Sequence, residues 1–394
     1  MDNPDRRIPL VKQQIIAEVD ALGAEIIGLT KTLYESPETA FEEQHACRWL
    51  SAFLENHGFT VQAAPGGVDT AFKAACTNAA AREPVLAFLA EYDALPKIGH
   101  GCGHNLIAGA SLGAAAALCR AWPQVAGSIL VVGTPAEEGG GGKALLAEGG
   151  VFDGVSAALM FHPGHYNHLG TDALGRIKAK VEFFGRSSHA AASPEDGINA
   201  LDAMVAAYTN ISAMRQQLPP DARIHGIITH GGEAPNVIPD YAAGLYYIRS
   251  IDRAFLKTLF EKFGDCCRGA ALATGCRCDI TVQPPSLEPM KRNTTLEGVW
   301  RDNMPQVGLT PYYGETGIGS TDLGNISQIM PVIQPFLAIC PPEVSIHTRQ
   351  FADATQSPQG AAALLAAAKL LALTACDYLA SESLQAAVAR EFAG

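Results

Sequence analysis

The pattern of apolar and polar positions divides the chain into two parts with different periodicities, and the change falls near Gly175. Before Gly175, short apolar runs of strand length alternate with segments whose apolar residues recur at the 3.6-residue helical period. Strands are predicted at 70–75, 85–90, 128–133 and 156–161. Helices are predicted at 12–33, 41–57, 105–122 and 141–149. This alternation is typical of an α/β sheet with mostly parallel strands.

After Gly175 the predicted elements follow the order strand-helix-strand-strand-helix-strand, which is that of a ferredoxin-like α+β unit. They lie at 176–184, 197–216, 224–230, 240–249, 252–275 and 278–283. The remaining chain predicts a helix, a glycine-rich stretch, a strand and a final helix, at 294–305, 314–319, 331–339 and 358–379. The predicted architecture is therefore one α/β domain, 1–174 plus 285–394, interrupted by an inserted α+β domain at 175–284.

Composition and charge narrow the class of protein. A chain of 394 residues is long for one domain, and 48% hydrophobic with 17% charged residues is typical of a globular protein. A net charge of −12 without clustered Lys and Arg argues against nucleic acid as a partner. No uninterrupted apolar run reaches the roughly 18–20 residues of a membrane span. The first residues lack the apolar core of a secretory signal, so we expect a cytoplasmic protein and no membrane partner.

The ten cysteines are spread over the whole sequence, and most are expected to be buried free thiols in a reducing compartment. A zinc knot formed by Cys266, Cys267, Cys276 and Cys278 is an alternative for four of them. The first pair lies in a predicted helix and the second in a predicted strand, without the CxxC spacing of such knots.

Three predicted strands are each followed by side chains that can ligate metals. Cys102 and His104 follow the strand at 85–90, the pair Glu137-Glu138 follows the strand at 128–133, and His162 follows the strand at 156–161. The carboxyl ends of parallel strands meet at one edge of a sheet, so these side chains are expected to lie close together. The sequence therefore predicts a metal site at that edge.

The adjacent carboxylates of Glu137 and Glu138 point in different directions, which suits metal-assisted hydrolysis. One can ligate an ion while the other accepts a proton from water bound there. A phosphate-binding loop is an alternative, because Gly139–Gly142 precede Lys143. That loop would need a glycine at 137, and two carboxylates repel phosphate. A solvated helix start with acidic residues is a further alternative.

Cys102 also has an alternative role as a nucleophile activated by His104. Side chains two residues apart on a turn share a metal more easily than they form an attacking pair. In isolation His162 and His347 are unremarkable, and His165 and His168 are expected to be loop histidines.

Taken together, the motifs are a specific set. In chain order they are Glu91-Tyr-Asp93-Ala-Leu-Pro, His100-Gly-Cys-Gly-His-Asn105, Thr134-Pro-Ala-Glu-Glu-Gly, Phe161-His-Pro163 and Ile346-His-Thr348. The set resembles metallopeptidase family twenty, and within it the amidohydrolase branch. This branch includes aminobenzoyl-glutamate hydrolases, auxin–amino-acid conjugate hydrolases, aminoacylases and the β-alanyl-lysine dipeptidase type. Further matches at 36–43, 188–192, 231–239 and 319–325 extend the resemblance over nearly the full chain.

The resemblance implies a di-metal exopeptidase-like sheet domain flanked by helices. Two divalent ions, zinc or manganese with cobalt also accepted, would be held by Cys102, His104, Glu138, His162 and His347, with the Cys102 thiolate as a bridge. Glu137 would be the general base, and Asp93 would orient a ligand imidazole. Glu91 stands where other branches carry a ligand histidine, and its role is left open.

The resemblance also implies that the inserted domain is a lid and a dimerisation domain. His189 would reach the active site of a partner subunit and stabilise the oxyanion of the tetrahedral intermediate. Asn236 and Arg249 would bind the substrate, Arg249 through a carboxylate, although Asp252 could pair with Arg249 instead. Gly101 and Asn105 differ from the commoner form of the metal-binding turn and are typical of the aminobenzoyl-glutamate and β-alanyl dipeptidase types.

The leading hypothesis is a homodimeric, metal-dependent amidohydrolase. Its substrate would be a small molecule, namely an N-acyl amino acid, an aminobenzoyl-glutamate-like conjugate or a small dipeptide. Two alternatives predict other behaviour: a catalytically silent relative that binds metal or amino acids, and a thiol hydrolase that uses Cys102.

Overall fold

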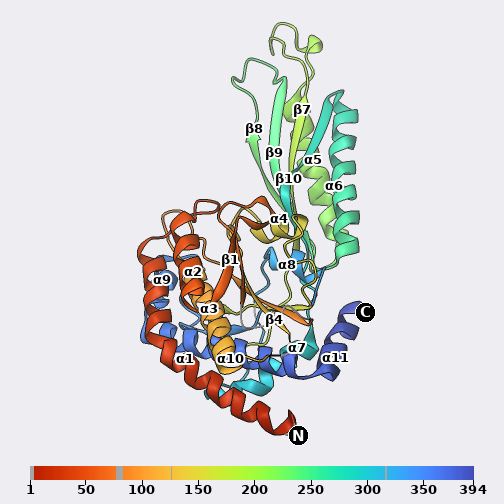
Figure 1. The fold of residues 1–394 in the computed structure, drawn as a ribbon. Helices are drawn as coiled ribbons and strands as arrows, with labels where there is room; N and C mark the ends of the chain where they lie inside the picture. Colours follow the sequence, from red (N-terminus) through yellow and green to blue (C-terminus); the bar gives the residue numbers. More distant parts are fainter. Residues whose placement is uncertain (1–3, 77–82, 126, 316) are drawn as a thin grey trace. The chain divides into compact units, whose positions relative to one another are not determined.

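A computed structural model describes residues 4–76, 83–125, 127–315 and 317–394 (Figure 1). The chain divides into two compact units. The first is built from Met1–Thr171, Lys291–Gly317 and Asn325–Gly394, and the second from Asp172–Met290 and Ile318–Gly324. Residues 318–324 thus belong to the second unit, whereas the sequence prediction placed them with the first.

A six-stranded sheet forms the centre of the first unit. In chain order its strands are β1 (Phe59–Ala63), β2 (Phe72–Cys76), β3 (Val85–Ala90), β4 (Ser128–Gly133), β5 (Ala157–Leu159) and β11 (Val332–Ile333). They are arranged β1-β2-β4-β3-β5-β11, with β4, β3, β5 and β11 parallel and β1 and β2 antiparallel at one edge. β3 and β4 are almost completely buried, which is why they read as continuous apolar runs. Their carboxyl ends lie at the same edge.

Helices α1, α3 and α10 pack against one another, and α3 also covers β3 and β4. The helices outside the second unit are α1 (Pro4–Glu35), α2 (Gln44–Asn56), α3 (His104–Ala121), α4 (Gly142–Glu148), α7 (Thr294–Asn303), α9 (Arg349–Ala354), α10 (Pro358–Ala380) and α11 (Glu382–Ala393). A short helix, α8 (Leu323–Ser327), crosses a boundary between the segments of the two units. The small residues of α3 allow this close packing. At Gly113 even a Cβ would lie 2.5 Å from the Ile26 side chain.

α10 is the one helix among the described residues that is long and apolar enough to cross a membrane. However, 72% of its apolar window is buried within the structure. Its contacts with α1 and α3 account for that burial, since a helix that is apolar all round is typical of a core.

Two predicted strands differ from the strands of the structure. The run at 156–161 forms the shorter strand β5, and a further strand that was not predicted, β6 (His162–Gly164), follows it. The run at 331–339 forms β11 and then β12 (Phe336–Ala338). β6 and β12 pair in parallel as a separate two-stranded sheet, with His162 opposite Phe336. Pro335 lies between β11 and β12, and it has no backbone N–H to donate to a neighbouring strand. Strand β1 and helices α8, α9 and α11 were not predicted from the sequence.

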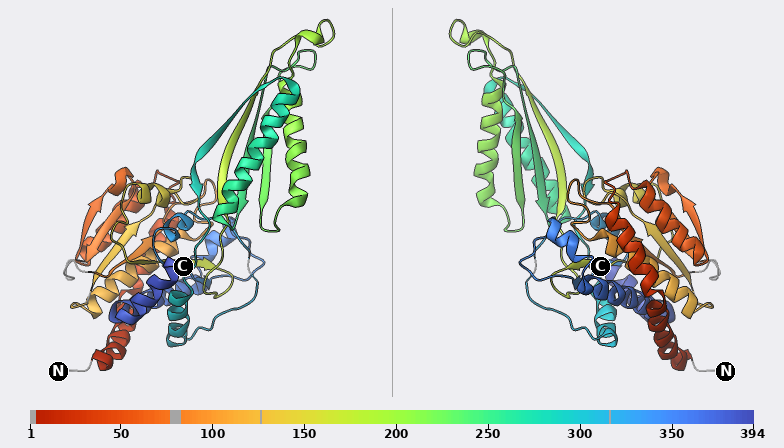
Figure 2. Two further views of the ribbon diagram at one scale, coloured as in Figure 1. Left: turned by 90° about the vertical axis from the view of Figure 1, so that its right-hand side faces the viewer. Right: turned by 90° about the vertical axis from the view of Figure 1, so that its left-hand side faces the viewer.

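The second unit consists of a four-stranded antiparallel sheet and two helices. The elements are β7 (Gly175–Phe184), α5 (Ala200–Met214), β8 (Arg223–His230), β9 (Tyr241–Ser250), α6 (Arg253–Thr274) and β10 (Arg277–Leu287). The strand order is β10-β7-β9-β8, and both helices pack on one face of the sheet (Figure 2). The helices begin where Asn199 and Asp252 accept hydrogen bonds from backbone N–H groups of the first turn.

Short 3₁₀ helices occur in both units. They lie at Pro65–Gly67 and Met304–Val307 in the first unit and at Pro194–Asp196 and Arg215–Gln217 in the second.

Candidate metal centre

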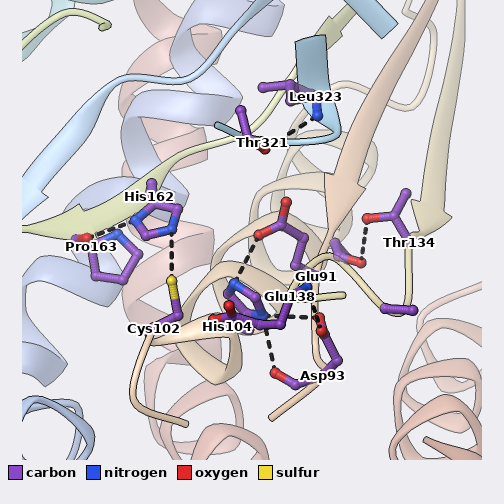
Figure 3. Close-up of polar contacts among 12 residues, drawn as sticks. Glu91, Asp93, Cys102, His104, Thr134, Glu138, His162, Pro163, Thr321 and Leu323 are labelled. Atoms are coloured by element: carbon purple, nitrogen blue, oxygen red, sulfur yellow. Dashed lines mark hydrogen bonds and ion pairs between the residues drawn. The ribbon is translucent and has the colours of Figure 1, made fainter. Parts of the chain in front are cut away.

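The structure brings the five predicted metal ligands together at the carboxyl edge of the parallel strands. Figure 3 shows four of them, Cys102, His104, Glu138 and His162. One atom from each of Cys102, His104 and His162 lies within 4.8 Å of the others. The same holds for Cys102, Glu138 and His347. Cys102 belongs to both groups, so its sulfur occupies the position from which one ligand can serve two ions.

Cys102 and His104 take their positions from a turn that strongly favours glycine at its centre. Gly103 between them has a φ of +78°, and a Cβ there would lie 2.4 Å from a side-chain carbon of Pro163. The turn directs the Cys102 sulfur to a point 3.5 Å from Nε2 of His162. The backbone N–H of His347 donates to the Gly101 carbonyl over 2.9 Å, which ties the distant ligand segment to the same turn.

His104 is held in one orientation by Asp93. Its Nδ1 lies 2.9 Å from a carboxylate oxygen and 3.0 Å from the carbonyl oxygen of Asp93, so Nε2 is the nitrogen left for another partner. Nε2 is buried and has no hydrogen-bond partner. Burial disfavours the charged imidazole, but the carboxylate of Asp93 and the neighbouring Cys102 and Glu91 outweigh it and raise the pKa of His104. Nε2 lies 3.3 Å from Oε2 of Glu91. A buried imidazole nitrogen without a hydrogen bond, among acidic groups and a thiol, fits a metal site.

Glu138 and His347 form the second pair of donors. Oε1 of Glu138 lies 3.3 Å from Nε2 of His347, and its side chain is only 13% exposed. Burial opposes the ionised carboxyl, yet the contacts with His347 and His104 hold the pKa of Glu138 below its ordinary value. This geometry disagrees with a solvated helix start. Glu137 precedes Glu138 and offers an oxygen within 4.8 Å of donors on His104 and Glu138.

The loop that carries Glu137 and Glu138 is anchored by buried carboxylates from other elements. Asp93 accepts a hydrogen bond from the backbone N–H of Glu138 over 3.0 Å. Glu43, just before α2, accepts one from the N–H of Ala136 over 2.9 Å. Ala136 has a φ of +61°, a conformation that side chains other than glycine seldom adopt. The two bonds hold this turn in the conformation that presents both glutamates.

Two charged residues of this region were not assigned a role from the sequence. Lys143 is completely buried, and its Nζ lies 2.5 Å from Oε1 of Glu91, which is 1% exposed. This pairing removes the phosphate-loop alternative, because the lysine faces a carboxylate. Glu43 lies in the matched segment 36–43 but was given no function, and its full burial becomes visible only in the folded structure.

The Cys102 thiol is not an activated nucleophile. His104, the activator considered from the sequence, favours the thiolate, but burial outweighs this effect. Burial raises the pKa of the Cys102 thiol. Burial also lowers the pKa of His162, which lies 3.5 Å away, to about 4. A catalytic thiolate needs the opposite shifts, since a protonated imidazole must stabilise it. The two groups are suited to ligating an ion, for which a neutral imidazole is required.

The three remaining candidates, His189, Asn236 and Arg249, lie in the second unit. His189 and Asn236 are exposed, and the N–H of Ala190 donates to the Asn236 carbonyl over 3.0 Å. Arg249 donates to the Ser320 hydroxyl over 3.2 Å, whereas Asp252 caps helix α6. The Arg249–Asp252 pairing considered from the sequence is therefore not formed. The alternative of a zinc knot is not supported by the structure. Among the described residues, no group with metal-ligand spacing contains any of its four cysteines, Cys266, Cys267, Cys276 and Cys278.

Comparison with known proteins gives one consistent family. The sequence model of peptidase family M20/M25/M40 matches residues 87–370. The Xaa-Arg dipeptidase of Mus musculus is 38% identical over 402 residues, which cover 98% of this chain and 93% of that protein. One chain of the p-aminobenzoyl-glutamate hydrolase of Escherichia coli (strain K12) is 34% identical over 308 residues, or 72% of this chain and 62% of that one.

Two solved structures share the fold. The aminobenzoyl-glutamate utilization protein of Klebsiella pneumoniae has a TM-score of 0.71 at 19% identity, covering 92% of this chain and 98% of its own. A dinuclear metal-binding peptidase of Bacillus subtilis has a TM-score of 0.66 at 20% identity, covering 90% of this chain and 99% of its own.

Proposed function

This chain belongs to peptidase family M20/M25/M40 and is a hydrolase of amide bonds, and we propose that it is a metal-dependent amidohydrolase that releases a free amino acid. Its substrate would be an N-acyl amino acid, an aminobenzoyl-glutamate-like conjugate or a small dipeptide. The observation that carries the proposal is the position of Cys102 in two groups of potential metal ligands, one with His104 and His162 and the other with Glu138 and His347.

The donor set fits two divalent ions. Cys102, His104 and His162 would hold one ion, and Cys102, Glu138 and His347 the other. A bridging thiolate with imidazoles favours zinc by its softness, while the carboxylate is compatible with manganese or cobalt. Asp93 would act through His104, because its hydrogen bond fixes which ring nitrogen faces the site.

Bound divalent ions supply a water of lowered pKa and polarise the scissile carbonyl. Glu137 then takes the proton from the attacking water and delivers it to the departing amine. Its neighbour Glu138 stays with the donors, since it lies beside His347. The adjacent pair thus divides the work between ligation and proton transfer.

Arg249 is proposed to bind the carboxylate of the substrate. It stands directly opposite Arg176 across β7 and β9, and opposite Arg223 across β9 and β8. Nε of Arg176 and Nε of Arg249 are both buried without a hydrogen-bond partner. Neighbouring guanidinium groups with free donors suit a carboxylate, which accepts two parallel hydrogen bonds. We therefore expect the enzyme to require a free α-carboxylate on the leaving amino acid, and the corresponding amide to be a poor substrate.

The second unit is proposed to be the lid and dimerisation domain inferred from the resemblance. Strand β8 lies at the edge of its sheet, and its residues Ile227 and Ile228 are 63% and 41% exposed to solvent. An apolar exposed edge strand favours association with another sheet edge. His189 would then stabilise the oxyanion in the partner's site, and Asn236 would contact the substrate. The cytoplasmic location expected from the sequence remains a prediction.

Chelation and one substitution test this proposal. Removal of metal should abolish hydrolysis of a panel of N-acyl amino acids, aminobenzoyl-glutamate, β-alanyl dipeptides and Xaa-Arg dipeptides, and zinc or manganese should restore it. Glu137→Gln should retain the metals and lower kcat by about 10²–10⁴-fold, because only the proton-accepting group is lost.

The outcomes separate the alternatives. Full turnover by the chelated protein would contradict the metal mechanism. Unchanged kcat in Glu137→Gln would contradict the assignment of the base. Two bound ions without hydrolysis of any substrate would indicate a silent relative, and inactivation by alkylation without protection by metal would indicate a thiol hydrolase.

A further inference from the structure

Glu91 and Lys143 form a fully buried ion pair at the edge of the candidate metal centre. Glu91 follows the last residue of β3, and Lys143 lies in the first turn of α4. Their exposures are 1% and 0%, and Nζ of Lys143 is 2.5 Å from Oε1 of Glu91. Burying two charges costs several kcal/mol per ion unless their other atoms are also satisfied, so such a pair calls for a reason.

The second oxygen of Glu91 is directed at the metal-facing nitrogen of His104 (Figure 3). Oε2 of Glu91 and Nε2 of His104 are 3.3 Å apart. Both atoms are buried. They face each other as an ion pair when His104 is protonated, and neither has another hydrogen-bond partner. The other nitrogen of His104 is already bonded to Asp93, so Nε2 cannot turn away.

This separation is that of two donors on one ion. Donors about 2.0–2.2 Å from a divalent ion stand about 3.0–3.5 Å apart at the usual angles. The pair of Glu138 and His347, at 3.3 Å, has the same spacing. Oε2 of Glu91 is thus placed like a ligand, while Oε1 is held by Lys143.

From this geometry, and resting on the proposed metal-dependent function, we propose that Glu91 is a further metal ligand and that Lys143 is the positioning residue that holds it. Lys143 offsets the carboxylate charge and fixes its rotamer, so that Oε2 and Nε2 of His104 bind the same ion. An added carboxylate oxygen makes this site harder than its thiolate and imidazoles alone, and carboxylate donors suit manganese. The ion on His104 is therefore expected to exchange between zinc and manganese more readily than a site of sulfur and nitrogen donors.

The test measures metal affinity directly. Metal-free protein is titrated with Zn²⁺ and with Mn²⁺ in competition with a chromophoric chelator, and bound Mn²⁺ is followed by electron paramagnetic resonance. Glu91→Gln should weaken Mn²⁺ binding by about tenfold or more, and Zn²⁺ binding less. Lys143→Met should shift both affinities in the same direction by a smaller factor. Glu148→Gln, an exposed carboxylate on the same helix, is the matched control and should bind both ions like the wild type.

Wild-type affinities for both ions in Glu91→Gln would overturn the inference. If that variant fails to fold because Lys143 loses its carboxylate partner Glu91, the double variant Glu91→Gln/Lys143→Met removes both charges and allows the same titration. A wild-type protein that binds no divalent ion would contradict the proposed function itself. Two ions bound equally well by the wild type and Glu91→Gln would contradict only the role of Glu91.

Discussion

Glu43 has an unusual environment for a carboxyl group, since it is fully buried and bonded to the backbone of Ala136. Burial raises the pKa of Glu43 from 4.5 to about 7. Between these values the folded protein binds a proton that the unfolded chain has released. Stability therefore falls as the pH rises through this window, and the loss is complete above about 7.

Glu43→Gln should remove this dependence, because an amide carries no charge at any pH. Relative to the wild type, the free energy of unfolding of the variant should rise by on the order of 3 kcal/mol between about pH 4.5 and 7.5. Urea unfolding of metal-free protein at both pH values measures this difference.

Glu38 is the matched control, because its pKa shifts in the opposite direction. Burial opposes ionisation there too, but hydrogen bonds from the N–H groups of Ala46 and His45 lower the pKa of Glu38. Its contribution is present above the unfolded pKa and is lost as the pH falls through the folded value. Glu38→Gln should therefore be more destabilising at neutral pH than in acid. A parallel response of the two variants would contradict the assignment for Glu43.

At the residue scale the sequence indicates which side chains gather at the candidate site better than it indicates the buried charges around them. Cys102, His104, Glu138, His162 and His347 could be named because each lies in a short motif, and the structure brings them together. Lys143 and Glu43 could not, because a buried charge is recognisable only when its partner is known, and that partner is distant in the sequence. Asn105 was taken as a pointer to the substrate, yet its buried amide donates to Thr30 and Thr355 and so supports helix packing.

At the element scale, the turn before α3 determines the geometry of the centre. Gly103→Ala would force a left-handed conformation on alanine and bring its Cβ against Pro163. We expect a loss of at least about 1–2 kcal/mol of stability together with weaker metal binding, because Cys102 and His104 flank the residue. Thermal unfolding and metal analysis of the purified protein measure both effects.

Gly139→Ala is the control for this substitution. It lies in the glycine-rich loop, but a Cβ there has no atom within 4 Å, and its φ is not in the left-handed region. This variant should retain wild-type stability and metal content. Equal losses in both variants would show that the effect is not specific to the turn.

Helices and strands were predicted well where the hydrophobic periodicity is strong. They were predicted poorly where a proline or long-range packing determines where an element begins and ends. The buried strands β3 and β4 and the order of elements in the second unit match the apolar pattern. The separation of β6 from β5 was not predicted, because it depends on pairing with β12, which is far along the chain. The short helices α8 and α9 lack the length over which a helical period becomes visible.

At the scale of the whole molecule, a dimer with shared active sites makes a quantitative prediction. Glu137→Gln and His189→Ala should each be nearly inactive alone. If His189 serves the partner's site, mixed dimers contain one site with both groups intact. Refolding the two variants together in equal amounts should then restore about one quarter of the wild-type activity, since half of the dimers are mixed.

Ultracentrifugation at the assay concentration confirms whether the protein is dimeric. Restoration in the mixture, with none in either variant alone, supports the shared site. A dimeric mixture that stays inactive would assign His189 to its own subunit or to no catalytic role. A monomer with full activity would exclude both the shared site and the proposed dimer.

The anchoring of His347 to the turn at Gly101 has a consequence for how the protein acquires its metal. The ligand positions run from 102 to 347, and α10, which follows them, packs against α1 and α3. The pocket therefore does not exist on a nascent chain until synthesis has passed α10. Under the proposed metal-dependent function, the ions would therefore bind after translation to a folded protein, and their supply at that moment would determine which ion is loaded.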